Sequence, residues 1–421
     1  MDEVTGVKIP ASAGTAAPGR LWAAHLFSLA AGSAIAVGVI YLPQTLLAAM
    51  AADYNVSATT ASILPTAVQV GYTLGIFMLV PLADRVAPGR QVTVQSVLLA
   101  AALLATTVMP NVAAAALGLV VVGLVANIAQ IIISTSAKVA PAGAGGSTVA
   151  TIVGSLAVGI FGGRILAGVL VATLGWRWVV TLFALLVLVM VPFLRAALRP
   201  AGGNPAASGY GGLLLSTLKA VRTSRTTAES VAMQFFVFAA FNCLWAAMVL
   251  HLTGPGHRWS AGHAGLFGLV GLAAGLSSPM VFRYLKGMSE LRIAGTFLLV
   301  FFLATASIAF DADIIPVFGA SVFLATMANQ FVQTAAQRRV LTANPNHPAP
   351  ANAAFMVGVF AGGAVGSFGG VTVFTHGGME LVGELAAALI LCASGVWGLA
   401  ARHHSQSLSA TAPADQQAPT A

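Results

Sequence analysis

The sequence predicts an all-α membrane protein with twelve transmembrane helices in two pseudo-symmetric six-helix bundles. Of its 421 residues, 58% are hydrophobic and only 7% are charged, whereas a soluble domain carries about 25% charged residues. Apolar runs long enough to cross a bilayer as a helix recur along the chain, for example QSVLLAAALLATTVMP and VVTLFALLVLVMVPFL. Membrane β-barrels show short alternating segments instead, so these runs favour helices.

Short polar loops divide the apolar runs into twelve predicted spans. Their limits are 21–50, 60–82, 91–109, 112–137, 148–173, 178–195, 227–252, 261–283, 291–309, 313–337, 351–375 and 380–400. The first run is too long for the apolar core of a signal peptide, so we expect an uncleaved span.

The longest internal break, 196–226, is rich in Gly, Pro, Ser and basic residues. It predicts a linker between two bundles, 21–195 and 227–400. The two ends, 1–20 and 401–421, are rich in Ala, Pro, Ser and Gln, and we expect them to be disordered.

The two halves contain similar segments at offsets of about 200 residues. GIFGGRILAG at 159–168 resembles GVFAGGAVGS at 358–367, and GYTLG at 71–75 has the glycine spacing of GLAAG at 271–275. NIAQ at 127–130 likewise resembles QFVQ at 330–333. Internal repeats of this kind build many secondary transporters, with the binding site between the halves near the bilayer midplane.

The basic residues predict the orientation in the membrane. If the N-terminus is cytoplasmic, sixteen of the nineteen Lys and Arg residues fall on the cytoplasmic side, and only Arg177 and Arg258 fall in outer loops. This is a strong positive-inside bias. We therefore expect both termini and the 196–226 linker to be cytoplasmic. The net charge of +8 then reflects topology, and no soluble basic face is left to bind nucleic acid.

The loop PLADRVAPGRQ after the second span resembles the corresponding loop of the major facilitator superfamily. In the family pattern Gly-x-x-x-Asp-Arg-x-Gly-Arg-Arg, this chain matches at Asp84, Arg85, Gly89 and Arg90, with Val80 in place of the first glycine and two extra residues before Gly89. The resemblance implies that Asp84, Arg85 and Arg90 form a gating loop.

Two further segments resemble the bacterial twelve-helix drug/proton antiporter branch of that family. They are YLPQTLLAAMAADYNVS at 41–57 and GIFGGRILAGVLVATLGWRW at 159–178. In the antiporter pattern Gly-x-x-x-Gly-Pro-x-x-Gly-Gly, three positions are changed, to Ser155, Ile160 and Arg164. The arginine that the family has in span four is absent from VVGLVANIAQ, so a proton relay built on it does not carry over.

Arg164 lies about sixteen residues into a predicted span that is otherwise apolar. A charge at mid-bilayer costs about 2.5–3.5 kcal/mol on insertion scales and usually has a function. One hypothesis is that Arg164 faces a central cavity and holds an anionic or polar group. The alternative is that it bonds to neighbouring carbonyl groups and holds helices together. No acidic residue is predicted at the same depth.

Uncharged polar residues recur on single helix faces, three or four residues apart. They either line a cavity or form hydrogen bonds between helices. An aromatic stripe of span seven, with Asn242 and Trp245, is either packing or an apolar wall for an amphipathic substrate. The predicted substrate-binding residues are Arg164, Tyr41, Gln44, Gln69, Tyr72, Asn127, Gln130, Asn242, Trp245, Gln330 and Gln333.

Proton coupling would need a titratable group nearer a membrane surface, because no carboxylate is predicted at mid-bilayer. The candidates are Glu229, Asp53 and, more weakly, His25. His251, His257 and His263 crowd one outer loop, but no acidic residue stands near them in the sequence, so we expect no metal site. We expect no cofactor either. The chain has no Gly-Lys pair, hence no P-loop, and no His-Glu-x-x-His.

The resemblance implies a non-enzymatic, monomeric, multi-pass transporter of a bacterial inner membrane, with a small-molecule substrate, protons and the lipid bilayer as its partners. The expected activity is export of a small organic compound by proton antiport. Two alternatives stay open: proton-coupled uptake of a small organic anion or carboxylate, and a ligand sensor that does not transport.

Overall fold

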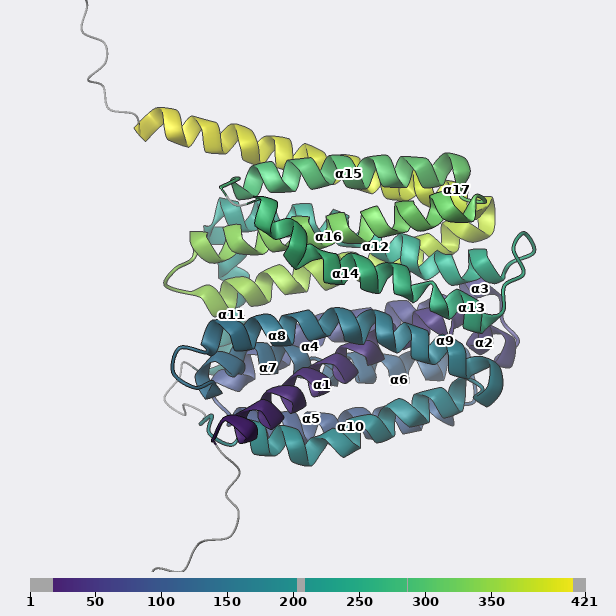
Figure 1. The fold of residues 1–421 in the computed structure, drawn as a ribbon, viewed down its shortest axis with the longest axis horizontal. Coiled ribbons are helices and arrows are strands. Elements are labelled where there is room, and N and C mark those ends of the chain that lie inside the picture. The colour runs from purple at the N-terminus through teal and green to yellow at the C-terminus, as the bar shows by residue number, and fades with distance from the viewer. Residues whose placement is uncertain (1–17, 203–208, 286, 412–421) are drawn as a thin grey trace, which may run out of the picture.

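Helices run back and forth along the long axis of the molecule in the computed structural model (Figure 1). The structure describes residues 18–202, 209–285 and 287–411. The described chain enters and leaves the bundle at one end, here called the terminal end; α2, α3 and α13 lie at the opposite end, here called the far end (Figure 1).

The N-terminal half contains ten α-helices, one 3-10 helix (η1) and one π-helix (η2). They are α1 (Pro18–Thr45), α2 (Leu47–Asp53), α3 (Ala58–Ala61), α4 (Ile63–Leu79), η1 (Pro81–Asp84), α5 (Pro88–Thr107), α6 (Val112–Val125), α7 (Ile128–Val139), α8 (Gly145–Ala157), η2 (Val158–Gly162), α9 (Gly163–Leu174) and α10 (Trp176–Leu198).

The C-terminal half has fewer separate elements because its helices are longer. They are α11 (Tyr210–Thr223), α12 (Arg225–Thr253), α13 (Ala261–Leu266), α14 (Gly268–Phe282), the 3-10 helix η3 (Arg283–Leu285), α15 (Glu290–Asp311), α16 (Ile315–Ala343) and α17 (Pro348–Thr411).

The predicted twelve spans all correspond to helices. Nine helices of the described chain are long and apolar enough to cross a membrane. One of these, α17, contains two predicted spans, because its backbone leaves helical geometry at Gly377 and Gly378, where Gly378 has φ of 65°. The remaining two spans are α5 and the region of α13 and α14, which includes the apolar stretch Ala261–Ser277.

The first predicted span, 21–50, is interrupted near its end. α1 contains Pro43 and ends at Thr45, and α2 begins at Leu47. A proline removes one backbone hydrogen bond and clashes with the carbonyl four residues earlier, so it weakens the helical turn that precedes the interruption.

One prediction about a segment outside the bundles needs correction. Within the predicted 196–226 linker, α10 runs to Leu198 and α11 forms a helix. The C-terminal segment was expected to be disordered from residue 401, yet α17 continues to Thr411, because this Ala- and Ser-containing stretch has no proline before Pro413. Residues 1–17 and 412–421 lie outside the described residues.

Within each half, a glycine brings two helices into close contact, and the pair of helices is equivalent in the two halves. A Cβ atom added to Gly159 would overlap the carbonyl oxygen of Ala34 on α1, and one added to Gly366 would overlap that of Ala239 on α12. Gly159 and Gly366 belong to the two similar segments in the sequence. Small residues allow such backbone contact between membrane helices, so span five packs on span one as span eleven packs on span seven.

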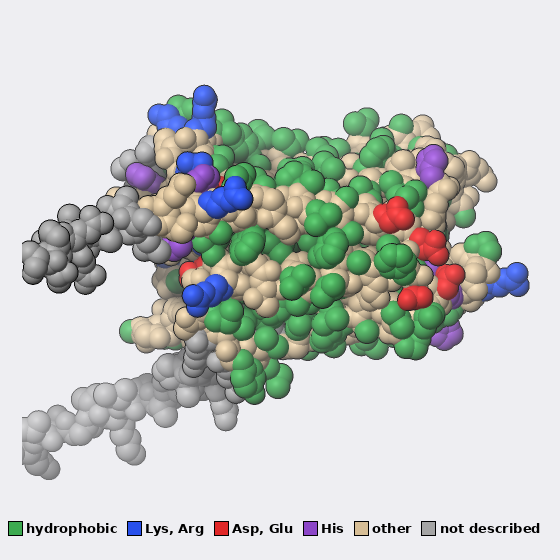
Figure 2. All heavy atoms as spheres, turned by 90° about the horizontal axis from the view of Figure 1, so that it is seen from above, with side chains coloured by type: hydrophobic (Ala, Val, Ile, Leu, Met, Phe, Trp, Pro, Cys, Tyr) green, Lys and Arg blue, Asp and Glu red, His purple; other side chains and the backbone are tan. Residues whose placement is uncertain are grey.

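Charged side chains are divided between the two ends of the bundle. Figure 2 shows Lys and Arg side chains gathered mainly at the terminal end and Asp and Glu side chains mainly at the far end, with hydrophobic side chains covering the face between them. The described residues thus separate charge as a membrane protein with a positive-inside bias does.

We predict that Gly366→Ala destabilises the purified protein by about 1–3 kcal/mol, because overpacking a tight contact forces backbone shifts. Its thermal unfolding in detergent measures this. The control is Gly395→Ala on the same helix α17, where a Cβ meets no atom within 4 Å. That change should be neutral or slightly stabilising, since alanine favours a helix over glycine. Equal melting temperatures for the two variants would contradict the close contact.

Candidate functional site

Arg164 lies where the fifth span changes from a π-helix to an α-helix. The π-helix η2 ends at Gly162, and α9 begins at Gly163. π-Helical turns often occur at functional sites. A Cβ atom on Gly163 would lie 3.3 Å from Gly38 on α1, so this turn packs closely on the helix that carries Tyr41 and Gln44.

The guanidinium of Arg164 is buried among aromatic rings, with the residue 4% exposed. Its central carbon lies 4.3 Å from the ring centroid of Trp245, 4.8 Å from that of Tyr41 and 5.8 Å from that of Phe161. Attraction between a cation and aromatic ring faces is worth about 2 kcal/mol when both are desolvated. The three rings therefore replace part of the lost hydration.

Arg164 has one hydrogen-bond partner and two free nitrogen atoms. Its Nη2 donates to Oε1 of Gln44 at 2.5 Å, while its Nε and Nη1 atoms are buried with no partner among the described residues. No Asp or Glu forms an ion pair with it in the described chain. Two donors thus remain for a further acceptor.

Gln44 links Arg164 to the other half of the molecule. Its Nε2 donates to Oδ1 of Asn242 on α12 and to Oγ of Ser367 on α17, each at 3.0 Å. Gln69 on α4 donates to the same Asn242 oxygen at 3.2 Å. Trp245, one helical turn along α12, donates to Oγ1 of Thr326 at 3.3 Å. A buried polar network therefore crosses between the halves.

The space beside Arg164 is small. A cavity of about 10 Å³ is lined by Gln44, Arg164 and Trp245 together with residues of α12, α13 and α14, which is about enough for one water molecule. A larger ligand requires the halves to separate here.

The halves are sealed at the far end. Thr59 on α3 and Thr375 on α17 share a hydrogen bond of 2.9 Å. Leu47, Ala51 and Ala61 of the N-terminal half form one buried apolar cluster with Ala246 and Val371 of the C-terminal half. Gly168 on α9 and Gly265 on α13 meet backbone to backbone.

Between the two halves, the terminal end is less tightly filled than the far end. A cavity of about 110 Å³ lies between α7, η1, α11 and the start of α17. Gln130, Ser134 and Asn352 contribute polar groups to its wall. Of the predicted binding residues, Gln130 therefore lies at this cavity and apart from the Arg164 network.

The structure brings six of the predicted binding residues together, namely Arg164, Tyr41, Gln44, Gln69, Asn242 and Trp245. Tyr72 stacks edge-on against Phe360 of the other half, with ring centroids 4.4 Å apart. Asn127 instead donates to Leu124 of the preceding turn at 2.7 Å. No described contact joins Gln330 or Gln333 to the network, and their role stays a prediction.

Two members of this network, Ser367 and Thr326, were not predicted from the sequence. Ser367 is the last residue of the repeat segment 358–367. A polar residue at the end of this Gly- and Ala-rich segment could have indicated a hydrogen-bonding position. Thr326 contacts Trp245, and Asn329 accepts a hydrogen bond from Gln234 at 3.3 Å. Thr326 and Asn329, rather than Gln330 and Gln333, form the described side-chain hydrogen bonds between the middle of α16 and α12.

The candidate proton carriers are in different surroundings. Asp53 forms an ion pair of 2.6 Å with Arg177, and the hydrogen bond from that guanidinium lowers the pKa of Asp53 below its usual value. Glu229 contacts His403 at 2.7 Å and both Arg225 and Arg339 at 3.4 Å, which joins α12, α16 and α17. His25 is half-buried on α1.

The predicted gating loop is formed by η1 and the start of α5. Asp84 ends η1, and its side chain lies outside the described part of the structure. Arg85 is half-buried and Arg90 is exposed. Tyr210 of the linker helix α11 donates to the carbonyl of Met78 at 2.7 Å, so the linker is attached beside this loop.

The expectation of no metal site rested on the absence of an acidic residue near the loop histidines. The structure contradicts that premise. Asp313, from the loop between α15 and α16, lies 3.5 Å from His257 and within reach of His251. His263 instead pairs with Ser260 at the start of α13.

Together these features define a multi-pass membrane protein whose two helical halves meet at a buried polar site. Residues 29–367 match the Major Facilitator Superfamily. The chain belongs to this family, which consists of transporters rather than enzymes.

The similar proteins give the fold and the family but not the substrate. The chain is 32% identical over 241 residues to the putative uncharacterized transporter YgaY of Escherichia coli, covering 57% of this chain and 60% of that protein. It is 28% identical over 264 residues to the probable transporter SCO4007 of Streptomyces coelicolor, covering 61% of this chain and 60% of that protein. The chain thus matches about 60% of the length of these relatives.

Two solved structures share the fold. One is a peptide transporter POT in complex with alafosfalin, with a TM-score of 0.69 and 14% identity, covering 90% of this chain and 94% of that one. The other is the nucleoside transporter NupG, with a TM-score of 0.70 and 13% identity, covering 89% of this chain and 98% of that one. At such low identity the likeness concerns the fold alone.

We predict that Asp53→Asn lowers the stability at pH 7 by less than about 1 kcal/mol, because the Asp53 and Arg177 side chains are 34% and 44% exposed. A carboxyl whose pKa is lowered in the folded state stabilises the fold above its unfolded pKa, about 3.9. This contribution is lost as the pH falls through the folded pKa. The difference in melting temperature from the unchanged protein should therefore be largest near neutral pH and should shrink as the pH falls from about 4 through the lowered pKa of Asp53.

The control is Glu384→Gln, which changes an exposed far-end carboxylate and should leave the melting curve unchanged. If the difference in melting temperature between Asp53→Asn and the parent protein were as large at pH 3 as at pH 7, the ion pair would not be its cause.

Proposed function

We propose that the chain is a secondary active transporter that exports a small organic compound in exchange for protons. Arg164 and the polar network around it would form the binding site. The observation that carries the proposal is the chain of contacts from Arg164 through Gln44 to Asn242 and Ser367. A ligand that replaces Gln44 as the partner of Arg164 also breaks the bonds that hold the two halves together.

The composition of the site favours an amphipathic substrate. Tyr41, Phe161 and Trp245 offer aromatic surface, while Arg164, Asn242 and Gln69 offer polar groups. Export rather than uptake rests on the resemblance of residues 41–57 and 159–178 to the drug/proton antiporter branch. We place the protein in a bacterial inner membrane with both termini cytoplasmic, so that the far end faces outward.

A second candidate is uptake of a small carboxylate. It is favoured by the free Nε and Nη1 atoms of Arg164, because each shares one edge of the guanidinium with Nη2, and a carboxylate binds such an edge through two parallel hydrogen bonds. Both candidates place the substrate at the same residue and differ in direction of flux.

We assign proton coupling to Glu229. It lies on α12, the helix that carries Asn242 and Trp245, and its carboxylate holds α12 to Arg339 of α16 and His403 of α17. Protonation would remove the charge that these contacts depend on. Asp53 is the weaker candidate because Arg177 lowers its pKa.

We predict that Arg164→Ala abolishes transport and that Arg164→Lys keeps only part of it, because lysine lacks the planar donor fork of arginine. Ligands are first found by thermal-shift screening of the purified protein with amphipathic compounds and small carboxylates. Hits are then tested in proteoliposomes with an imposed pH gradient, in both directions. Arg258→Ala, an exposed far-end change, serves as the control and should transport normally.

Outward flux of an amphipathic compound supports export, and inward flux of a carboxylate supports the second candidate. Binding at Arg164 without flux identifies a sensor and overturns both. Normal transport by Arg164→Ala would mean that the charge serves helix packing only.

We predict that Glu229→Gln loses transport driven by the pH gradient and retains substrate exchange without a gradient. The amide keeps the shape of the side chain but cannot carry the proton. Asp53→Asn is assayed beside it and should retain gradient-driven transport. The opposite result for the two variants would move the coupling site to Asp53.

A further inference from the structure

A second group of polar side chains lies at the far end of the C-terminal half, away from the Arg164 network. It borders a cavity of about 220 Å³ between the end of α12, the loop that follows it, the loop between α15 and α16, and the break in α17 at Gly377 and Gly378. Nothing in the proposed transport cycle uses these side chains.

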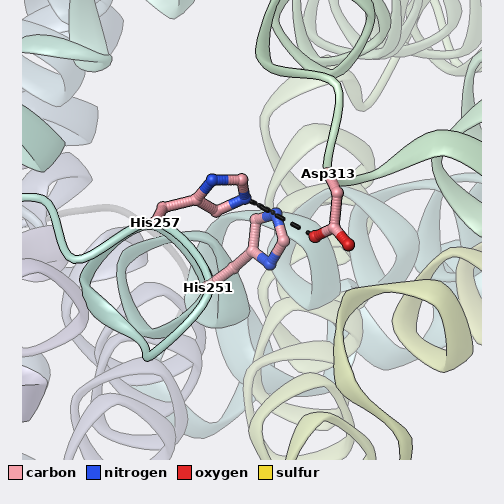
Figure 3. A group of neighbouring side chains, drawn as sticks. All are labelled: His251, His257 and Asp313. Carbon is pink, nitrogen blue, oxygen red and sulfur yellow. Dashed lines mark hydrogen bonds and ion pairs between the residues drawn. The ribbon is translucent and has the colours of Figure 1, made fainter.

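Three potential metal ligands converge in this cavity (Figure 3). Nε2 of His251, at the end of α12, lies 3.3 Å from Nε2 of His257 in the following loop. The same His257 atom lies 3.5 Å from Oδ1 of Asp313. All three ligand atoms are within 4.8 Å of one another.

The separations suit a tetrahedral ion. Zinc binds imidazole nitrogen and carboxylate oxygen at about 2.0–2.2 Å, which sets ligand atoms about 3.3–3.6 Å apart at tetrahedral angles. Two of the three separations, 3.3 Å and 3.5 Å, match this spacing, and the third, between His251 and Asp313, is within 4.8 Å. Imidazole ligands also favour zinc and its neighbours over magnesium or calcium.

The tautomer of His251 decides whether it can bind an ion. Its Nε2 atom faces both Nε2 of His257 and the carbonyl oxygen of Ala312, the latter at 3.0 Å. A neutral imidazole carries one hydrogen, so Nε2 either donates to the Ala312 oxygen or, with the hydrogen on Nδ1, offers its electron pair to a cation. Metal binding at this site requires the second tautomer.

The ligands are held on packed elements. The His251 ring lies edge-on against Phe318 of α16, with centroids 5.1 Å apart, and is 9% exposed. The His257 side chain is 12% exposed, whereas that of Asp313 is 84% exposed, which gives an ion a path from solvent. Glu380 also lines the cavity, and its carboxylate is a further acidic group near the three ligands.

We propose that His251, His257 and Asp313 form a binding site for Zn²⁺. Three protein ligands and an open position make it a site that exchanges its ion with solvent rather than a closed structural site. The bound ion ties the end of α12 to the loop between α15 and α16. His251 follows Trp245 by six residues, about 9 Å along the helix, so the ion braces the helix that carries the transport site.

The test uses the full-length protein without a histidine tag, purified in detergent and stripped of metal. Zn²⁺ is titrated in competition with a chromophoric zinc chelator, and Mg²⁺ is titrated in parallel. The expected result is one Zn²⁺ per chain, no competition by Mg²⁺, and a higher melting temperature with Zn²⁺.

The key variants are His257→Gln and Asp313→Asn, since neither change replaces the buried ring of His251. Each should weaken Zn²⁺ binding about tenfold or more and reduce the rise in melting temperature. His376→Ala is the matched control, an exposed far-end histidine outside the cluster, and should bind as the unchanged protein does. Equal Zn²⁺ affinity in His257→Gln and the parent chain, or no saturable binding by the parent chain, overturns the proposal.

Discussion

A guanidinium in the hydrocarbon core of a bilayer has no water to hydrate it, and the centre of this molecule is arranged around that constraint. Arg164 is surrounded by three aromatic rings and one amide oxygen, and it keeps two donors unused. The surrounding helices approach closely because η2 and α9 meet α1 through glycines. The charge is tolerated because residues from both halves of the molecule surround the guanidinium.

The same small-residue packing occurs in both halves. Gly159 fits against α1 and Gly366 against α12, so the site lies between two helix pairs built alike. This arrangement explains why the segments 159–168 and 358–367 resemble each other. In the second segment, Gly362 and Gly366 keep the packing, and Ser367 adds a hydroxyl that reaches Gln44.

Much of this could be predicted from the sequence, because hydropathy and glycine spacing are local signals. The twelve spans, the buried Arg164 and its lack of a carboxylate partner follow from such signals. The rotation of α16 about its axis does not, since Thr326 and Gln330 are both polar and only packing decides which one meets Trp245. The pairing of Asp313 with His257 was also missed, because 56 residues separate them in the chain and they meet only through the arrangement of α12, α15 and α16. The extension of α17 to Thr411 was missed because its composition resembles that of a disordered segment. The helix α11 in the linker was likewise not apparent from composition.

The hydrogen bonds that join the halves at the centre are few. Three of them, from Gln44 to Asn242 and Ser367 and from Gln69 to Asn242, would together contribute about 2 kcal/mol at the typical value for interhelical bonds in membranes. That corresponds to a population ratio of about 20 to 1 between conformers with and without them. Reversing that ratio would take a ligand that binds the conformer without these bonds about 400-fold more tightly than the conformer with them.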